Sequence, residues 1–469
     1  MMDYKVKVYP MVCVDAPAVD TPPRNGKNGS MSSIKILSAS ELDSDFFEPR
    51  TFSDDTAAVV ADIICQVRRE GDSALHQLAA RFDPATPEQL EIAPEDLATA
   101  AEDLRCQRPE LYEALCYSRD LALRFARRQR QSFDDFEEEL EPGLIAGQRN
   151  IPVDSAGLYV PAGRFPLLST VIMTATPALA AGCGQVLLCT PPRPHPDGSG
   201  KPYADPGILA TAHLCGVHRV FACGGAQAIA AMAYGTESIP RCDVIVGPGN
   251  KFVAEAKRQV YGTVGIDMLA GPTEVFIIAD DSAHADWVAA DLLAQAEHDP
   301  DAQAVLATPS QELAQAVARQ LELQLETLAT AETARTSIQR NGCIIITKDL
   351  EEAACLANRK APEHLELALD DGPQLEALVA MVHNYGSLFI GHGSAEVLGD
   401  YAAGLNHTLP TSTSARFAGG LSVRCFLKTV TTLRTVPGSQ GQRRSATAAG
   451  LLGDAEGLAA HAKAARIRL

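Results

Sequence analysis

The spacing of apolar residues divides the chain into a helical first part and a second part in which strands and helices alternate. In 55–81 and 96–128, apolar residues recur every three or four positions, as on the buried face of an amphipathic helix. After Asn150 short apolar runs appear instead, each followed by a turn rich in glycine and then by a helical pattern. This alternation predicts parallel sheets whose strands are connected by crossover helices.

The expected strands are numerous enough for two sheets. They are 184–189, 219–222, 243–246, 274–278, 304–306, 343–346 and 387–390. Roughly seven strand–helix units in about 270 residues favour two doubly wound sheets over a single one. We therefore expect an α/β protein with two Rossmann-like doubly wound parallel-sheet domains and small N- and C-terminal extensions.

Both ends of the chain depart from this pattern. Residues 1–32 are rich in Pro, Asp, Asn and Gly and lack the basic-then-apolar order of a signal peptide, which predicts a disordered leader. The acidic run 133–140 predicts a solvated surface, and the Ser-, Gly- and Arg-rich run 438–447 predicts a linker. A last helix is expected from Asp454, as its N-cap, to Ile467, and such a helix often docks on a neighbouring subunit.

Composition and charge exclude several classes of function. The 469 residues carry a net charge of −19, which makes nucleic acids and anionic membranes poor partners. Because neither a signal peptide nor an apolar run of the ~18 residues that span a bilayer is found, we expect a cytoplasmic protein. The twelve cysteines form no C-x-x-C pair, so buried free thiols are favoured over disulfides or a cysteine zinc site. The cysteines in or beside apolar runs are Cys183, Cys189, Cys215, Cys223 and Cys343.

Gln295 and His298 form the first candidate constellation. They are three residues apart near the end of a predicted helix that stops at Pro300, so they share one helical face. A neutral imidazole together with an amide oxygen suits zinc. The alternative is a histidine that interacts with the last carbonyl groups of its helix, and the motif alone does not exclude it.

Two further segments contain groups that could carry chemistry. Glu363 and His364 follow Pro362 at the start of a predicted strand, where they could supply two proton-transfer groups or simply a polar strand start. The segment 399–410 combines a carboxylate, an asparagine, a histidine and two glycines, although a capped helix end explains it equally well.

No G-x-G-x-x-G fingerprint occurs, so the residues alone do not predict NAD. The glycine turns after the strands could approach a nucleotide or could be ordinary tight turns.

Taken together and in order, these segments resemble the histidinol dehydrogenase family along nearly the whole chain from Ser33. The matching segments are 157–163, 224–230, 247–250, 266–268, 270–274, 295–298, 362–364, 399–410 and 455–461. Each motif is weak by itself, but the collinear set is highly specific. The resemblance implies a zinc-dependent enzyme that oxidises L-histidinol to L-histidine through the aldehyde with two NAD, in the last steps of histidine biosynthesis.

The resemblance also implies residue roles and an intertwined homodimer with shared active sites. It implies that one Zn²⁺ per subunit is held by Gln295, His298 and Asp400 of one chain and by His461 of the partner subunit. Glu363 would activate the hydrolytic water, and His364 would be the acid/base for the alcohol proton. The implied substrate-binding residues are Thr273, Gln295, His298, His364, Asp400, His407, Glu456 and His461. The implied NAD-contacting residues are Tyr159, Gln227 and Asn250.

We place the domain boundaries accordingly. We expect a leader at 1–32, a small N-terminal extension at 33–54, a discontinuous first domain of 55–156 and 276–421, a second, NAD-binding domain at 157–275, and a tail at 422–469 that docks on the partner subunit.

The chain departs from the family's usual pattern at four places. Position 273 is threonine instead of serine, position 162 is alanine instead of glycine, 194–206 is a longer connection, and 411–414 differs after the Leu-Pro-Thr. None removes a metal or catalytic group, but they leave the substrate preference open. The alternatives are a relative that oxidises another hydroxymethyl compound with NAD and a catalytically silent zinc-binding scaffold.

Overall fold

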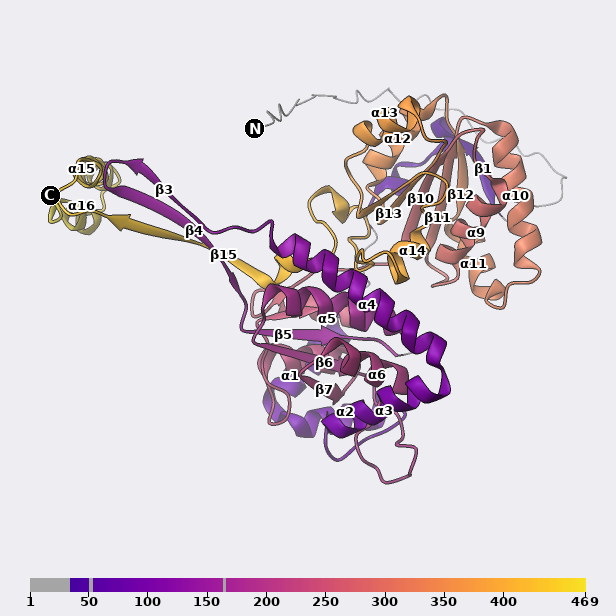
Figure 1. The fold of residues 1–469 in the computed structure, drawn as a ribbon, viewed down its shortest axis with the longest axis horizontal. Coiled ribbons are helices and arrows are strands. Elements are labelled where there is room, and N and C mark those ends of the chain that lie inside the picture. Colours follow the sequence, from indigo (N-terminus) through magenta and orange to yellow (C-terminus); the bar gives the residue numbers. More distant parts are fainter. Residues whose placement is uncertain (1–33, 50–53, 163–165) are drawn as a thin grey trace. The chain divides into compact units, whose positions relative to one another are not determined.

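The computed structural model describes residues 34–49, 54–162 and 166–469, and the leader expected at 1–32 lies outside them. The described chain forms two compact units, coloured along the sequence in Figure 1. Of the described residues, the first unit comprises 34–49, 272–396 and 410–419, and the second comprises 54–162, 166–271, 397–409 and 420–469. Each contains a six-stranded sheet with helices on both faces, which confirms the expected mixed α/β fold with parallel sheets.

The sheet of the first unit is parallel throughout and has the order β1-β12-β11-β10-β13-β14. Its strands are β1 (Lys35–Ser38), β10 (Glu274–Ala279), β11 (Gln303–Thr308), β12 (Cys343–Ile346), β13 (His364–Ala368) and β14 (Ser387–Ile390). From the central β10 the chain winds outward to one side through β11 and β12 and then to the other through β13 and β14, so the sheet is doubly wound.

Helices cover both faces of this sheet and bury two apolar cores. They are α9 (Ala285–Ala296), α10 (Gln311–Leu325), α11 (Ala331–Asn341), α12 (Leu350–Lys360) and α13 (Pro373–Met381). One core lies between the sheet and α9, α10 and α11, and the other lies between the sheet and α12 and α13. The expected extension 33–54 is corrected in part, because its residues 35–38 form the edge strand β1 of this sheet.

The sheet of the second unit repeats the same winding, with the order β2-β7-β6-β5-β8-β9. Its strands are β2 (Glu91–Ile92), β5 (Ser155–Tyr159), β6 (Gln185–Thr190), β7 (Arg219–Ala222), β8 (Val244–Val246) and β9 (Gly265–Ile266). All pairs are parallel except that β2 is antiparallel to β7. The chain reverses direction across the sheet between β5 and β8, where doubly wound sheets usually bind ligands beyond the carboxyl ends of the strands.

The helices that precede this sheet in sequence pack on it, which corrects the expected domain boundary. They are α1 (Asp54–Glu70), α2 (Asp72–Phe82), α3 (Pro94–Gln107) and α4 (Pro109–Arg130). They pack against α5 (Leu168–Ala181), α6 (Pro206–Cys215), α7 (Gly225–Tyr234) and α8 (Lys251–Val260) of the same unit. Residues 55–156 therefore belong with the second sheet and not with 276–421. Helical periodicity shows that a helix buries one face, but not which sheet covers that face.

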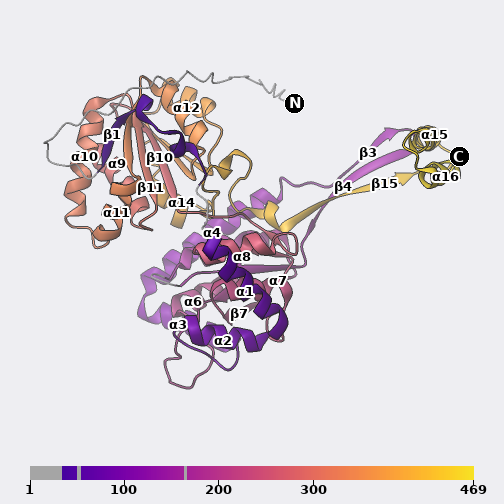
Figure 2. The ribbon, with the colours of Figure 1, turned by 180° about the vertical axis from the view of Figure 1, so that it is seen from behind.

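A three-stranded antiparallel sheet was not expected from the sequence. It consists of β3 (Phe136–Glu141), β4 (Leu144–Pro152) and β15 (Leu427–Thr435), and Figures 1 and 2 show it leading to α15 (Gln440–Ala455) and α16 (Ala459–Arg466). The acidic run 133–140 is thus largely a strand, held by its backbone ladder to β4. The supposed linker 438–447 is largely helix, because Ser439 caps α15 by accepting a hydrogen bond from the N–H of Gln442.

The cysteines named from the sequence are buried and free, as expected. They are Cys183, Cys189, Cys215, Cys223 and Cys343. The expected loop 194–206 connects β6 to α6. Within the described ranges, no helix combines the length and the apolar character needed to cross a membrane.

Candidate active site

Glu363 lies where β13 begins, beside the beginning of β10 in the same sheet. Because His364 pairs with Val275 of the adjacent parallel strand, Glu363 comes next to Thr273 and Glu274. Glu363 is only 6% exposed, and its carboxylate accepts hydrogen bonds from the Thr273 hydroxyl and, at 2.9 Å, from the backbone N–H of Glu274. The sheet register therefore holds this carboxylate in one place.

Burial raises the pKa of the Glu363 carboxyl from 4.5 to about 7. The neighbouring His364 and the hydrogen bonds from Thr273 and Glu274 lower the pKa, but desolvation is the larger effect. A carboxyl group with a pKa near neutrality exchanges protons readily at physiological pH, which suits a general base.

His364 is a buried imidazole among acidic and hydrogen-bonding groups. Its Nδ1 lies 3.2 Å from the backbone carbonyl of Glu274 and 3.7 Å from the carboxylates of Glu363 and Glu396. The ring of Phe389 lies beside it, with the centroids 5.9 Å apart. These acceptors favour the tautomer that carries its proton on Nδ1, which leaves Nε2 as the atom that can accept a proton.

Gln295 lies in the last turn of α9 with its side chain fully buried. The two ends of an amide are told apart by their partners. One orientation puts the amide nitrogen 3.4 Å from His364 Nδ1 and turns the oxygen toward acceptors only. In the other, the nitrogen donates to Glu396 Oε1 at 2.9 Å, and the oxygen accepts from Glu274 N at 3.0 Å. We assign the second orientation, because both amide atoms then have suitable partners.

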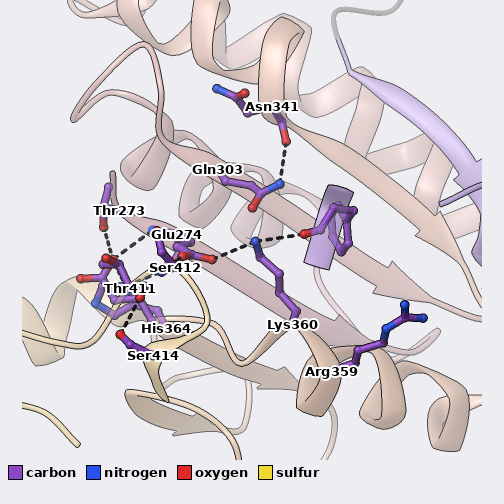
Figure 3. A network of polar contacts seen from close by, with 12 residues as sticks. Thr273, Glu274, Gln303, Asn341, Arg359, Lys360, His364, Thr411, Ser412 and Ser414 are labelled. Carbon is purple, nitrogen blue, oxygen red and sulfur yellow. Dashed lines mark hydrogen bonds and ion pairs between the residues drawn. The ribbon is translucent and has the colours of Figure 1, made fainter. Parts of the chain in front are cut away.

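A buried ion pair supports the strand that carries these groups. Lys360 Nζ lies 3.2 Å from Glu274 Oε2, with both side chains nearly inaccessible, and also donates to the backbone carbonyl of Phe46 at 3.3 Å (Figure 3). The other oxygen of Glu274 accepts a hydrogen bond from the backbone N–H of Ser412. Glu274 therefore connects the end of α12 and the segment 410–419 to the start of β10.

His298, the second predicted ligand on α9, lies just beyond the end of that helix and is exposed. Its backbone N–H contacts the carbonyl of Gln295 at 3.4 Å, so the two residues belong to the same helix terminus. The first unit thus contains Thr273, Gln295, His298 and the pair 363–364 of the predicted site, and it gathers all of them except His298 into one network of contacts.

The residues predicted to contact NAD lie at the carboxyl edge of the sheet in the second unit. Tyr159 ends β5, and its hydroxyl accepts a hydrogen bond from the N–H of Gly225 at 3.0 Å. Gln227 is buried in the first turn of α7. Asn250 follows β8 and caps α8, with its side chain accepting from two N–H groups of that helix at 3.0 and 3.2 Å. Tyr159 and Asn250 therefore flank the point at which the strand order reverses.

Asp83 is a neighbour of this group that sequence reasoning missed. It is the C-cap of α2, and its carboxylate lies 3.5 Å from the amide nitrogen of Gln227. Burial raises the pKa of the Asp83 carboxyl to about 6. In the sequence it follows Arg81-Phe82 as an ordinary end to a helix, so no signal set it apart.

The remaining predicted residues belong to the second unit. Asp400 lies in α14 (Glu396–Tyr401), and His407 follows in the segment 402–409. Glu456 caps the end of α15, and His461 lies exposed on α16. Among the described residues, no three His, Cys, Asp or Glu side chains are grouped as a metal site.

Comparison with known proteins identifies the family. Residues 48–469 match the family described as histidinol dehydrogenase. The chain is 46% identical over 421 residues to a histidinol dehydrogenase from Brucella suis, covering 90% of this chain and 94% of the relative. It is also 46% identical over 420 residues to a histidinol dehydrogenase from Thermus thermophilus, covering 89% and 96%.

A solved structure shows the same fold. The crystal structure of histidinol dehydrogenase from Elizabethkingia anophelis has a TM-score of 0.85 and 32% sequence identity, covering 94% of this chain and 99% of that one. The family match, residues 48–469, includes residues of both units. The chain therefore belongs to the histidinol dehydrogenase family of oxidoreductases.

Proposed function

We propose that this protein is a zinc-dependent histidinol dehydrogenase that oxidises L-histidinol to L-histidine through L-histidinaldehyde with two NAD. The observation that carries the proposal is the buried Glu363–His364 pair in a chain that matches this family along most of its length. An oxidation from alcohol to acid requires two hydride transfers and one addition of water. The pair offers a separate proton-transfer group for the alcohol and for the water.

The two groups would act in sequence. His364 Nε2 accepts the hydroxyl proton of the alcohol as the carbon loses its hydride, which gives the aldehyde. Glu363, as a carboxylate, then accepts a proton from water as the water oxygen bonds to the aldehyde carbon, giving a hydrate that loses the second hydride to become the acid. The raised pKa of Glu363 makes it a better proton acceptor than an exposed carboxylate. When bound, NAD accepts the hydride in each oxidation.

For the metal, we propose Gln295, His298 and Asp400 of one chain and His461 of the partner subunit as the ligands. Two imidazoles, an amide oxygen and a carboxylate form a donor set that suits zinc. The amide oxygen of Gln295 is buried and faces hydrogen-bond donors, so it is available as an electron-pair donor, which is compatible with that role. When bound, zinc would hold the polar groups of the substrate and orient its carbinol carbon.

For NAD we propose binding at the carboxyl edge of the sheet in the second unit, with contacts from Tyr159, Gln227 and Asn250. The crossover between β5 and β8 supports this location, because dinucleotides bind at such a point in other doubly wound sheets. For the substrate we propose contacts from Thr273, His407 and Glu456 in addition to His364 and the metal ligands.

The proposed homodimer has a physical basis in the C-terminal segment. Several apolar side chains on β15, on α15 and at the two caps of α16 are exposed in the single chain, namely Leu433, Leu451, Leu452, Leu458 and Ile467. Apolar side chains in such numbers favour burial against another protein surface. We propose that 422–469 docks on the partner subunit and brings His461 and Glu456 to its site, in a cytoplasmic enzyme of histidine biosynthesis.

Turnover assays test the function. Purified protein with zinc and NAD should form two NADH per L-histidinol and little NADH with small diols. Faster turnover of a diol would favour the alternative, a relative that oxidises another hydroxymethyl compound. No turnover with either substrate, despite bound zinc, would favour a silent scaffold.

Mixing of inactive variants tests the shared metal site. His298→Ala and His461→Ala chains should each be inactive alone, but a heterodimer should contain one site with all four ligands. Co-refolding an equal mixture should therefore recover part of the wild-type activity, up to roughly a quarter if pairing is random, since half of the dimers are mixed and each has one intact site. Absence of recovery, with dimers present, would contradict a site shared between subunits.

A further inference from the structure

Glu396 touches two residues of the candidate active site and has no role in the proposal above. It is the first residue of α14 and is only 1% exposed. Its carboxylate lies 3.7 Å from His364 Nδ1 and accepts a hydrogen bond of 2.9 Å from the amide nitrogen of Gln295. Burial of a carboxylate costs folding free energy unless the group is paired or hydrogen-bonded. The contacts that Glu396 makes with these two residues therefore require an explanation.

The backbone of Glu396 is itself held in place. Its N–H donates to Glu366 Oε1 at 2.7 Å, and Glu366 is a buried residue of the central strand β13. The same strand begins with His364. The position of the Glu396 carboxylate relative to the imidazole is therefore set by the sheet and not by a mobile loop.

The effect on Gln295 follows from hydrogen-bond chemistry. A carboxylate only accepts hydrogen bonds, so it attracts the amide nitrogen and repels the amide oxygen. With the nitrogen facing Glu396, the oxygen faces Thr273 and the N–H of Glu274. Only the oxygen of a neutral amide can ligate a metal, because the nitrogen carries two hydrogens and has no available lone pair.

The effect on His364 is similar. A carboxylate 3.7 Å from Nδ1, together with the Glu274 carbonyl at 3.2 Å, favours the tautomer with a proton on Nδ1. The imidazole then presents Nε2 as its acceptor. One side chain thus influences which atom each of two neighbours presents.

We propose that Glu396 is a positioning residue that orients the amide of Gln295 and the imidazole of His364. Its importance for a metal rests on the proposed function, in which Gln295 is a zinc ligand. The hydrogen bond between Glu396 and Gln295 does not rest on it, because it joins two side chains of this chain and involves no metal atom. The two parts can therefore be tested separately.

The first experiment uses the metal-free protein. Unfolding by urea is measured for the wild type, Glu396→Gln, Gln295→Glu and the double variant. Glu396→Gln allows either orientation of Gln295, and Gln295→Glu places two carboxylates face to face. The double variant restores an amide donor facing a carboxylate, so it should be more stable than the sum of the two single effects predicts. Strict additivity of the three changes would overturn the proposal, whether or not the protein binds zinc.

The second experiment uses the zinc-loaded enzyme. Zinc affinity is measured by competition with a chromophoric chelator, and kcat and KM are measured with L-histidinol. Glu396→Gln should weaken zinc binding about 10- to 100-fold, as loss of an orienting partner does at other metal sites. It should also lower kcat at saturating zinc by more than it raises KM, because His364 is less well oriented for the chemical step. Unchanged zinc affinity and kcat would overturn the positioning role.

Glu376→Gln provides a matched control. Glu376 also lies in the first turn of a helix of the first unit, α13, but it is exposed. The Glu376→Gln variant should retain wild-type zinc affinity and kcat. If only Glu396→Gln changes these two quantities, the change cannot come from a lost charge at a helix N-terminus. If the wild type binds no zinc and turns over no histidinol, the proposed function fails, while the urea experiment still decides the orientation of Gln295.

Discussion

The hydroxyl of Thr273 donates a hydrogen bond to the carboxylate of Glu363, a residue ninety positions later in the chain. The two residues precede adjacent parallel strands, β10 and β13, so the register of the sheet brings them together. This bond stabilises the ionised form of a carboxyl group that burial otherwise keeps protonated. The balance between the two effects determines when Glu363 can act as a base.

We predict that kcat/KM rises as the pH passes through about 7, because Glu363 must be ionised to accept a proton and its pKa is raised to about 7. Thr273→Val removes the hydroxyl but keeps the shape, so it should shift this rise to higher pH. Thr273→Ser keeps the donor and is the control. The dependence of kcat/KM on pH in the aldehyde half-reaction measures the position of the rise in both variants. A profile in the valine variant identical to that of the wild type would contradict the role of the hydroxyl.

Glu363→Gln and His364→Asn should damage different half-reactions. Without the carboxylate, water activation is lost, so oxidation of the aldehyde should slow by about 100- to 10,000-fold and oxidation of the alcohol by much less. Without the imidazole, the first oxidation should already slow by a similar factor. Single-turnover NADH formation, started from histidinol and from the aldehyde, separates the two steps.

Zinc content is the control for both variants, because neither side chain is a proposed ligand. It should remain near the wild-type level in each. Equal slowing of both half-reactions by Glu363→Gln would contradict the proposed division of roles.

The ion pair between Lys360 and Glu274 should contribute strongly to stability. Both side chains are about 95% inaccessible, as their exposed fractions are 5% and 6%, so Lys360→Met leaves a buried carboxylate without its cation. Removal of one partner of such a pair costs about 3–5 kcal/mol of unfolding free energy. Urea denaturation measures the loss.

An exposed ion pair gives the comparison for Lys360→Met. Arg434 and Glu137 pair at 3.1 Å with more than half of each side chain exposed. Arg434→Met should therefore change the unfolding free energy by no more than about 1 kcal/mol. Similar losses in the two variants would show that burial of the Lys360 pair adds little.

The sequence predicted the two parallel sheets because strand–turn–helix alternation is a local pattern. It failed where the outcome depends on distant partners. The run from Phe136 to Glu141 contains four acidic residues and looks like solvated surface, yet it pairs with β4, which in turn pairs with β15 almost three hundred residues later. A strand that is exposed on both faces carries no apolar alternation to reveal it.

The candidate site also combines residues that the sequence indicated with residues that it did not. Glu363 and His364 stood out because two proton-transfer groups are adjacent in sequence, and Gln295 because of its spacing from His298. Glu396 did not stand out, since an acidic residue at the start of a helix usually serves the helix itself. Asp83 did not stand out because it follows the helical pattern as an ordinary polar residue. Their contacts with Gln295 and Gln227 arise only from folding, over distances of about 100 and 144 positions.

Gly247 is a position where the fold of the second unit requires glycine for two separate reasons. Its φ is +118°, and a Cβ would lie 2.1 Å from the backbone oxygen of Tyr159, an atom of the central strand β5 that has little freedom to move. Its own carbonyl accepts a hydrogen bond from Lys257, and its N–H donates to Asp267, so the turn is also tied to a buried ion pair. Gly262 separates the two effects, because it has a φ of +96° but nothing within 4 Å of an added Cβ. Gly262→Ala should cost only the backbone strain, on the order of 1–3 kcal/mol, whereas Gly247→Ala adds a steric clash and should lower the melting temperature much further or prevent folding. Calorimetry of both variants measures the difference, and equal melting temperatures would mean that β5 can move to accommodate the methyl group.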